Sequence, residues 1–180
     1  MALDRTLPGV QALKHVVVLM LENRSFDHML GALKATHPNI DGLDGIESNP
    51  DSTEADIKVQ PLTEFRGQLM PDPHHDFASV DSQIFSGVAP GPGRQPNMQG
   101  FIRTYHAQQQ PNVDASHAVI YHFSADLPNN LPVLHGLATQ FTVFNRWFAS
   151  IPGPTLCNRA FAHYGTSFGN VGMDPFYVAW

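Results

Sequence analysis

The strongest constraint on the fold is an uninterrupted apolar run near the N-terminus. Residues 16–21 read VVVLML, and the three consecutive valines disfavour a helix because each is branched at Cβ. A continuous apolar run of this length is typical of a strand buried on both faces, as in a parallel sheet. At six residues it is far shorter than the roughly 20 that a membrane-spanning helix needs, so we expect no transmembrane segment.

Composition narrows the class of protein. The 180 residues are 42% hydrophobic, which is enough for one packed domain or part of a larger one. The net charge is −6, and an acidic chain lacks the cations that a general nucleic-acid binder needs. The single cysteine, Cys157, excludes an internal disulfide framework and a cysteine-cluster zinc site. Residues 1–10 lack the basic and apolar blocks of a secretory signal, which leaves the cytoplasm as the default compartment.

Helical spacing of apolar residues returns directly after the first run. A helix is expected over residues 25–34, capped by Ser25 or Asn23. Further helices are expected at 77–85 with Asp76 as cap, at 98–106, 114–123 and 130–139, and from Thr155 onward. A short strand near 57–59 and a second buried strand from 141 to about 148 complete an α/β pattern of alternating elements.

The first candidate site is the turn that follows the apolar run. Glu22 and Asn23 lie there, and ligands of open α/β sheets collect outside the carboxyl ends of strands. A carboxylate and an amide carbonyl are hard oxygen donors that suit a divalent cation. The alternative from spacing alone is a helix cap beside a solvated glutamate.

The second candidate site is the turn Pro152-Gly153-Pro154-Thr155, after the second expected strand. We expect Thr155 at the N-cap of the next helix, where backbone N–H groups and the helix dipole favour an anion. A hydroxyl in that place could attack phosphorus, and Asn158, about one turn on, could face the same anion. Simple capping by Thr155 is the alternative.

The histidines offer a candidate general acid and the cysteine a candidate nucleophile. His74 and His75 lie between Asp72 and Asp76, and a histidine beside a phosphate can protonate a leaving oxygen. Cys157 could be taken for a nucleophile, but free cysteines are so often buried that a structural thiol is the preferred interpretation.

Several segments resemble one known family. They are HVVVLMLENRSFDHMLG at 15–31, DPHHD at 72–76, MQGF at 98–101, LPVLHGLATQFTVFNRWFASIPGPT at 131–155, and NR at 158–159. In this order they resemble the bacterial phosphoesterase family that contains phosphatidylcholine-hydrolysing phospholipase C and a related acid phosphatase. The resemblance covers nearly the whole chain.

The resemblance implies an alkaline-phosphatase-like α/β sheet with flanking helices. It also implies a metal-dependent phosphoesterase that passes through a covalent phospho-enzyme and acts on a phosphate ester, including a phospholipid head group. By position, Glu22, Asn23 and Thr155 resemble ligands of a divalent cation, and Thr155 also resembles the nucleophile. Asn158 resembles a phosphate-site residue and His75 the active-site histidine, with His74 as its neighbour and competitor.

Some positions depart from the family. Cys157 stands where a proline is usual, Leu156 where a polar residue is common, and Asn145 where an aspartate is common. Family members are considerably longer, so we expect residues 1–180 to be the N-terminal part of one phosphoesterase domain, weak or inactive alone. Two alternatives follow. One is a non-catalytic fragment without a complete metal site, and the other is another alkaline-phosphatase-like transferase or a sulfatase, the latter suggested by Cys157.

Overall fold

A computed structural model describes residues 9, 13–22, 24–61, 71–108, 120–126 and 131–174. Short helices and two small sheets make up a mixed α/β arrangement. In chain order the elements are α1 (Phe26–Leu30), the 3₁₀ helix η2 (Gly31–Ala35), β1 (Ser48–Pro50), β2 (Asp56–Lys58), β3 (Gln60–Pro61), α2 (Phe77–Phe85), α3 (Phe101–Gln108), β4 (Tyr121–His122), α5 (Pro132–Gln140) and α6 (Thr155–Tyr164). None of the described helices is long and apolar enough to cross a membrane.

The two sheets each contain two strands. β1 and β2 pair antiparallel with Asn49 opposite Ile57, and β3 pairs parallel with β4 with Gln60 opposite Tyr121. β2 confirms the strand expected near 57–59. The prediction of a helix at 114–123 is wrong at its C-terminal end, because Tyr121–His122 pairs as a strand. Residues 114–119 of that predicted helix lie outside the described residues.

The helix caps follow the sequence closely. The Ser25 hydroxyl accepts from the His28 N–H at 3.0 Å and begins α1, while the Asp76 carboxylate accepts from the Ser79 N–H at 3.0 Å and begins α2. α3 begins at Phe101 instead of 98, because Met98 has a left-handed backbone with φ of 57° and cannot continue a helix.

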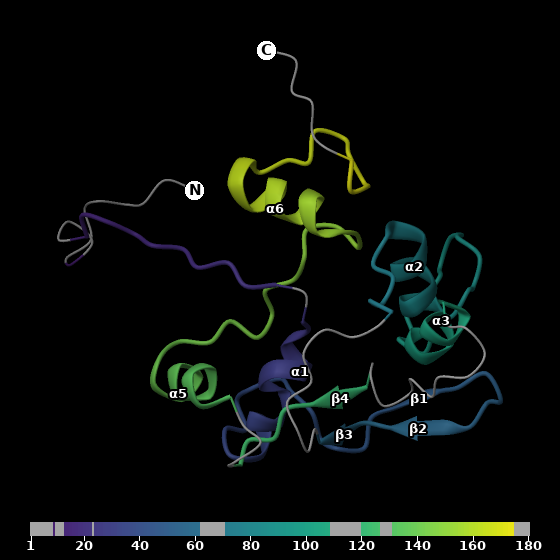
Figure 1. The fold of residues 1–180 in the computed structure, drawn as a ribbon, viewed down its shortest axis with the longest axis horizontal. Helices are drawn as coiled ribbons and strands as arrows, with labels where there is room; N and C mark the ends of the chain where they lie inside the picture. The colour runs from purple at the N-terminus through teal and green to yellow at the C-terminus, as the bar shows by residue number, and fades with distance from the viewer. Residues whose placement is uncertain are drawn as a thin grey trace.

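The best-packed part of the chain lies around α2, α3 and β1. Ile102 and Tyr105 of α3 are buried, and Gly100 passes so close to α2 that an added Cβ would lie 2.0 Å from the Ser82 carbonyl oxygen. The buried Asn49 side chain joins β1 to α3, since it accepts from the Phe101 N–H at 2.9 Å and donates to the Met98 carbonyl at 2.8 Å. In Figure 1 these elements form the right-hand side of the molecule.

Both long apolar segments expected as buried strands are irregular and exposed. The side chains of Val16, Val17, Val18, Leu19 and Leu21 are 68–90% exposed, and those of Phe141, Phe144, Trp147 and Phe148 are 68–81% exposed. The expectation of a strand was wrong for both segments in this structure. A strand is stable only where a neighbour satisfies its N–H and C=O groups, and the described residues supply no such neighbour to either segment.

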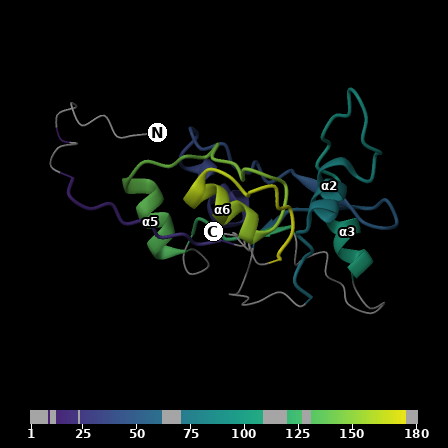
Figure 2. The ribbon, with the colours of Figure 1, turned by 90° about the horizontal axis from the view of Figure 1, so that it is seen from above.

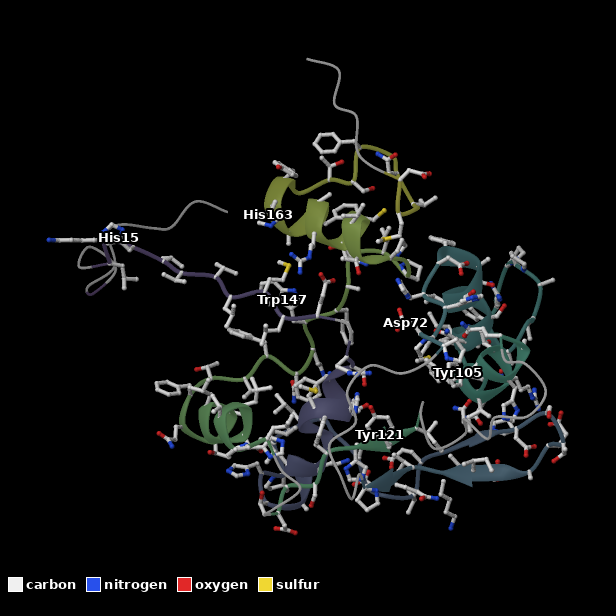
Figure 3. The ribbon with its side chains drawn as sticks, in the orientation of Figure 1. His15, Asp72, Tyr105, Tyr121, Trp147 and His163 are labelled. Carbon is white, nitrogen blue, oxygen red and sulfur yellow. The ribbon has the colours of Figure 1, made fainter. Side chains whose placement is uncertain are left out.

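The views agree on where the N-terminal segment lies. Residues 13–22 run from α1 out to one side, away from α2 and α3, in both Figures 1 and 2. Figure 3 shows Trp147 apart from Tyr105 and Tyr121, which belong to the packed elements. The molecule therefore has a folded body with two apolar segments that pack on little of it.

Candidate active site

The turn after the first apolar segment contacts α6. The Glu22 carboxylate oxygen Oε1 forms an ion pair with Arg159 Nε, joining residues 137 positions apart. Both side chains keep some solvent exposure, 29% for Glu22 and 43% for Arg159. Asn23, the other half of the predicted cation-binding pair, lies outside the described residues.

The N-terminus of α6 differs by one residue from the expectation. Pro154 is the N-cap, with φ −77° and ψ 172°, and no side chain caps the helix. Thr155 is therefore the first helical residue and not the N-cap, and its hydroxyl is not spent on capping. Thr155 and Arg159 are four residues apart and share one face of α6, so the Glu22 carboxylate is held on the face that carries Thr155.

Asn158 holds the loop that precedes α6. Its Oδ1 accepts from the N–H groups of Ser150 and Ile151 at 3.0 and 3.2 Å. Its Nδ2 lies 3.2 Å from the Ile151 carbonyl and 3.0 Å from the Gly153 carbonyl. The Asn158 side-chain amide therefore bonds to backbone groups of the loop through both its oxygen and its nitrogen. These bonds fix the shape of the turn that precedes Thr155.

His74 and His75 line a separate cavity of about 720 Å³. The His75 Nδ1 lies 3.0 Å from the Pro73 carbonyl and 3.9 Å from the Asp72 carboxylate. The His74 backbone is tied to both neighbouring helices, because its N–H donates to Gln108 and its carbonyl accepts from Gln83. Figure 3 shows Asp72 on the side of the molecule that carries Tyr105, whose hydroxyl donates to the Pro71 carbonyl at 2.7 Å.

Glu22 and Arg24, on either side of residue 23, reach these two places. Glu22 contacts α6, while Arg24, two residues later, lines the same cavity as His74 and His75. Neither Glu22 nor Thr155 is among the described residues that line the cavity. Glu22 therefore contacts α6 and Arg24 borders the histidine cavity, and among the described residues no contact joins Thr155 to His75.

The family model named Phosphoesterase family matches residues 13–177, which is most of the chain. The chain belongs to the phosphoesterase family. Members of this family are hydrolases that act on phosphate esters, and the resemblance drawn from the sequence motifs is confirmed.

Curated relatives carry phospholipase C names. The phosphoesterase chain is 44% identical over 161 residues to non-specific phospholipase C6 of Arabidopsis thaliana, covering 88% of this chain and 28% of that protein. It is 42% identical over 170 residues to non-specific phospholipase C1 of Arabidopsis thaliana, and the match covers 90% of this chain and 30% of that protein. Non-hemolytic phospholipase C of Pseudomonas aeruginosa is 26% identical to this chain over 159 residues, and the match covers 88% of this chain and 21% of that protein. The chain spans less than a third of the length of these relatives.

The described residues do not complete a metal site for this phosphoesterase. The Glu22 carboxylate and the Thr155 hydroxyl are hard oxygen donors, but hard cations take about six such ligands. No group of three histidine, cysteine, aspartate or glutamate side chains comes together within the described ranges. In addition, Glu22 is already paired with the Arg159 guanidinium, so the residues as placed do not fit a bound cation.

Cys157 is a buried structural thiol. Its side chain is fully buried, and its Sγ donates to the Gly172 carbonyl at 3.1 Å. It therefore faces the loop after α6 and not the Thr155 surface. This confirms the preferred interpretation of Cys157 and removes the basis for a sulfatase-like nucleophile.

His28 and Asp27 have shifted pKa values that the sequence did not indicate. The His28 ring lies between Tyr121, at 4.2 Å, and Phe123, at 5.2 Å, measured between ring centroids. Burial lowers the pKa of His28 to about 4, with the positive charge of Arg24 adding to the effect. Burial also raises the pKa of Asp27, and the carboxylates of Glu47 and Asp41 raise it further. The only signal in the sequence was the aromatic pair Tyr121 and Phe123, whose proximity to residue 28 no local pattern predicts.

Proposed function

We propose that this chain is the N-terminal part of a phosphoesterase domain that hydrolyses phosphate esters, with Thr155 as the nucleophile. The observation that supports this best is that Glu22 contacts α6 while Arg24, two residues later, lines the histidine cavity. The uncapped start of α6 adds to it, because the alternative that Thr155 merely caps the helix does not apply.

The proposed reaction has two steps. The Thr155 oxygen forms a bond to phosphorus as the bond from phosphorus to the leaving oxygen breaks, giving a phosphothreonine and an alcohol. His75 supplies the proton that the leaving oxygen takes up, with His74 as the alternative donor. The proton of the Thr155 hydroxyl passes to solvent in the first step. In the second step water cleaves the bond between the Thr155 oxygen and phosphorus, which releases phosphate or a phosphomonoester, restores the Thr155 hydroxyl and returns a proton to the histidine. Asn158 keeps the 150–154 loop in the shape that presents Thr155.

A divalent cation at Glu22, Asn23 and Thr155 would need further ligands and the release of Glu22 from Arg159, so no step of the proposed reaction is assigned to it. We also propose that the fold to which the chain belongs is an alkaline-phosphatase-like α/β sheet with flanking helices, as the family resemblance implies. The proposed substrates are phosphate esters, including the head group of a phospholipid, as the names of the relatives suggest.

The test compares Thr155→Val with Thr155→Ser in the 180-residue chain. The substrates are p-nitrophenyl phosphate and p-nitrophenyl phosphorylcholine, assayed with and without Mn²⁺. We expect Thr155→Val to abolish the weak turnover of the chain, while Thr155→Ser retains part of it, since serine, unlike valine, keeps an attacking hydroxyl. Thr139→Val on α5 is the control, because its hydroxyl only donates to the Gly136 carbonyl on the surface. Full activity in Thr155→Val would reject the mechanism.

A second candidate is a non-catalytic chain that lacks a complete metal site. The exposed apolar segments and the lack of a three-ligand group among the described residues favour it. It predicts no turnover of either substrate and no rise in melting temperature with Mn²⁺. Turnover by the 180-residue chain that depends on Thr155 would exclude it.

A further inference from the structure

Residues 71–75 are fastened to the packed helices by side chains of α2 and α3. Tyr105 and Gln108 of α3 donate hydrogen bonds to the carbonyl groups of residues 71 and 72, at 2.7 and 3.0 Å. Gln83 of α2 donates to the carbonyl group of residue 74 at 2.8 Å. The backbone on the N-terminal side of His75 is therefore held in place by two helices, and the imidazole ring extends from a fixed support.

Two hydrogen-bond acceptors face the same nitrogen of the His75 ring. Its Nδ1 lies 3.0 Å from the Pro73 carbonyl oxygen and 3.9 Å from the Asp72 carboxylate. A carbonyl and an ionised carboxylate only accept, so the proton of the neutral ring belongs on Nδ1. The hydrogen bonds that the described residues give to His74 run instead through its backbone. Of the two neighbouring histidines, His75 is the one whose ring is oriented.

We propose that Asp72 is a positioning residue that acts through His75. This inference rests on the proposed function, in which His75 protonates the leaving oxygen. The charged ring keeps its Nδ1 proton toward Asp72 and the Pro73 carbonyl, and it gives its Nε2 proton to the leaving oxygen. The ring that remains is the neutral Nδ1–H form, which is the form that the two acceptors stabilise. Asp72, Pro73 and His75 all line the cavity of about 720 Å³, which is open to a ligand.

The contribution of Asp72 is modest because water reaches both side chains. The His75 side chain is 39% exposed and the Asp72 side chain 45% exposed, so solvent screens their attraction. A pair of this kind changes an equilibrium or a rate by up to about fivefold. The effect depends on the leaving group, since p-nitrophenolate leaves without a proton whereas the more basic phenolate needs one.

The first experiment determines which ring nitrogen of His75 carries the proton, by ¹⁵N nuclear magnetic resonance of the 180-residue chain at alkaline pH. His75→Gln identifies the signals. We expect the parent ring mainly in the Nδ1–H form, and the ratio of Nδ1–H to Nε2–H to fall about two- to fivefold in Asp72→Asn. Asp72→Glu keeps a carboxylate and should stay closer to the parent. Asp41→Asn is the matched control, since it removes an exposed carboxylate that is paired with Arg146.

The second experiment compares kcat for phenyl phosphate and p-nitrophenyl phosphate. Asp72→Asn should lower kcat about three- to fivefold with phenyl phosphate and less than about twofold with p-nitrophenyl phosphate. Equal losses with both substrates would indicate a merely structural role and overturn the inference. A parent His75 ring mainly in the Nε2–H form, or the same ratio in the parent and Asp72→Asn, would also overturn it. The nitrogen spectra require no turnover, so they decide the inference even where the Thr155→Val assay rejects the proposed reaction.

Discussion

Two regions of this chain show that apolar content alone does not decide which side chains are buried. Around α2, α3 and β1, moderately apolar sequence is packed, with Ile102 fully buried and Asn49 satisfying backbone groups on two sides. Segments 16–21 and 141–148 are more apolar, yet their large side chains are mostly exposed. The difference is pairing. The first region carries its own hydrogen-bond partners, whereas each apolar segment needs neighbouring strands that the described residues do not provide.

The comparison bears on the proposed active site. Glu22 follows the first exposed segment and Thr155 follows the second, while His74 and His75 are tied to the packed helices α2 and α3. The histidine part of the site is therefore held by packed helices, whereas the Glu22 part is joined to the Thr155 part by the contact between Glu22 and Arg159. Stability measurements on variants in the two regions test this contrast.

The largest expected effect is at Ile102. Its side chain is fully buried on α3, so Ile102→Ala should remove apolar contacts and leave a cavity. We expect the free energy of unfolding to fall by about 2–5 kcal/mol, measured by urea denaturation followed by circular dichroism. A loss below about 1 kcal/mol would mean that the α2–α3 region is not the packed part of the molecule.

A substitution of Asn49 tests the buried hydrogen bonds of the same region. Asn49→Ala should cost about 1–3 kcal/mol, because it leaves the Phe101 N–H and the Met98 carbonyl without their side-chain partner. The control is Asn145→Ala in the second apolar segment, where the exposed amide makes one 3.2 Å bond to the Asn39 carbonyl. We expect less than about 0.5 kcal/mol there. Equal losses in the two variants would contradict the contrast between the regions.

His28 gives a pH-dependent test. Its pKa is lowered to about 4 in the folded chain and is about 6.5 when unfolded, so the unfolded chain binds the proton more tightly. The stabilisation from the neutral ring is complete above about pH 6.5 and is lost as the pH falls toward 4. We expect a loss of up to about 2 kcal/mol, since part of the ring remains accessible to solvent.

The check for His28 is urea denaturation between pH 7 and pH 4.5. Carboxylates also titrate as the pH falls, so the informative quantity is the difference between the parent chain and His28→Leu. His28→Leu should show a shallower fall in stability than the parent. Parallel curves would show that the ring is not held neutral between Tyr121 and Phe123.

Sequence alone predicted the local features well and the long-range ones poorly. The caps at Ser25 and Asp76, α2, α5, and the buried thiol of Cys157 follow from short-range chemistry, and the structure confirms them. The two buried strands expected at 16–21 and 141–148 are absent, because strand pairing depends on distant residues. The contact between Glu22 and Arg159 is likewise long-range, and no spacing rule predicts it. Within α6 the same limit is visible on a small scale, since Pro154, not Thr155, takes the N-cap position.

The smallest expected effect belongs to the apolar segments themselves. Val17 is 90% exposed and Phe144 69% exposed, so Val17→Thr and Phe144→Thr remove almost no buried surface. We expect each to change the free energy of unfolding by less than about 0.5 kcal/mol, and the amides of residues 16–21 and 141–148 to exchange with solvent faster than those of α3. A loss above about 1.5 kcal/mol in either variant, or protected amides in its segment, would mean that the segment is paired in solution. In that case Glu22 or Thr155 would follow a rigid strand, and the site would not depend on Arg159 to bring the two turns together.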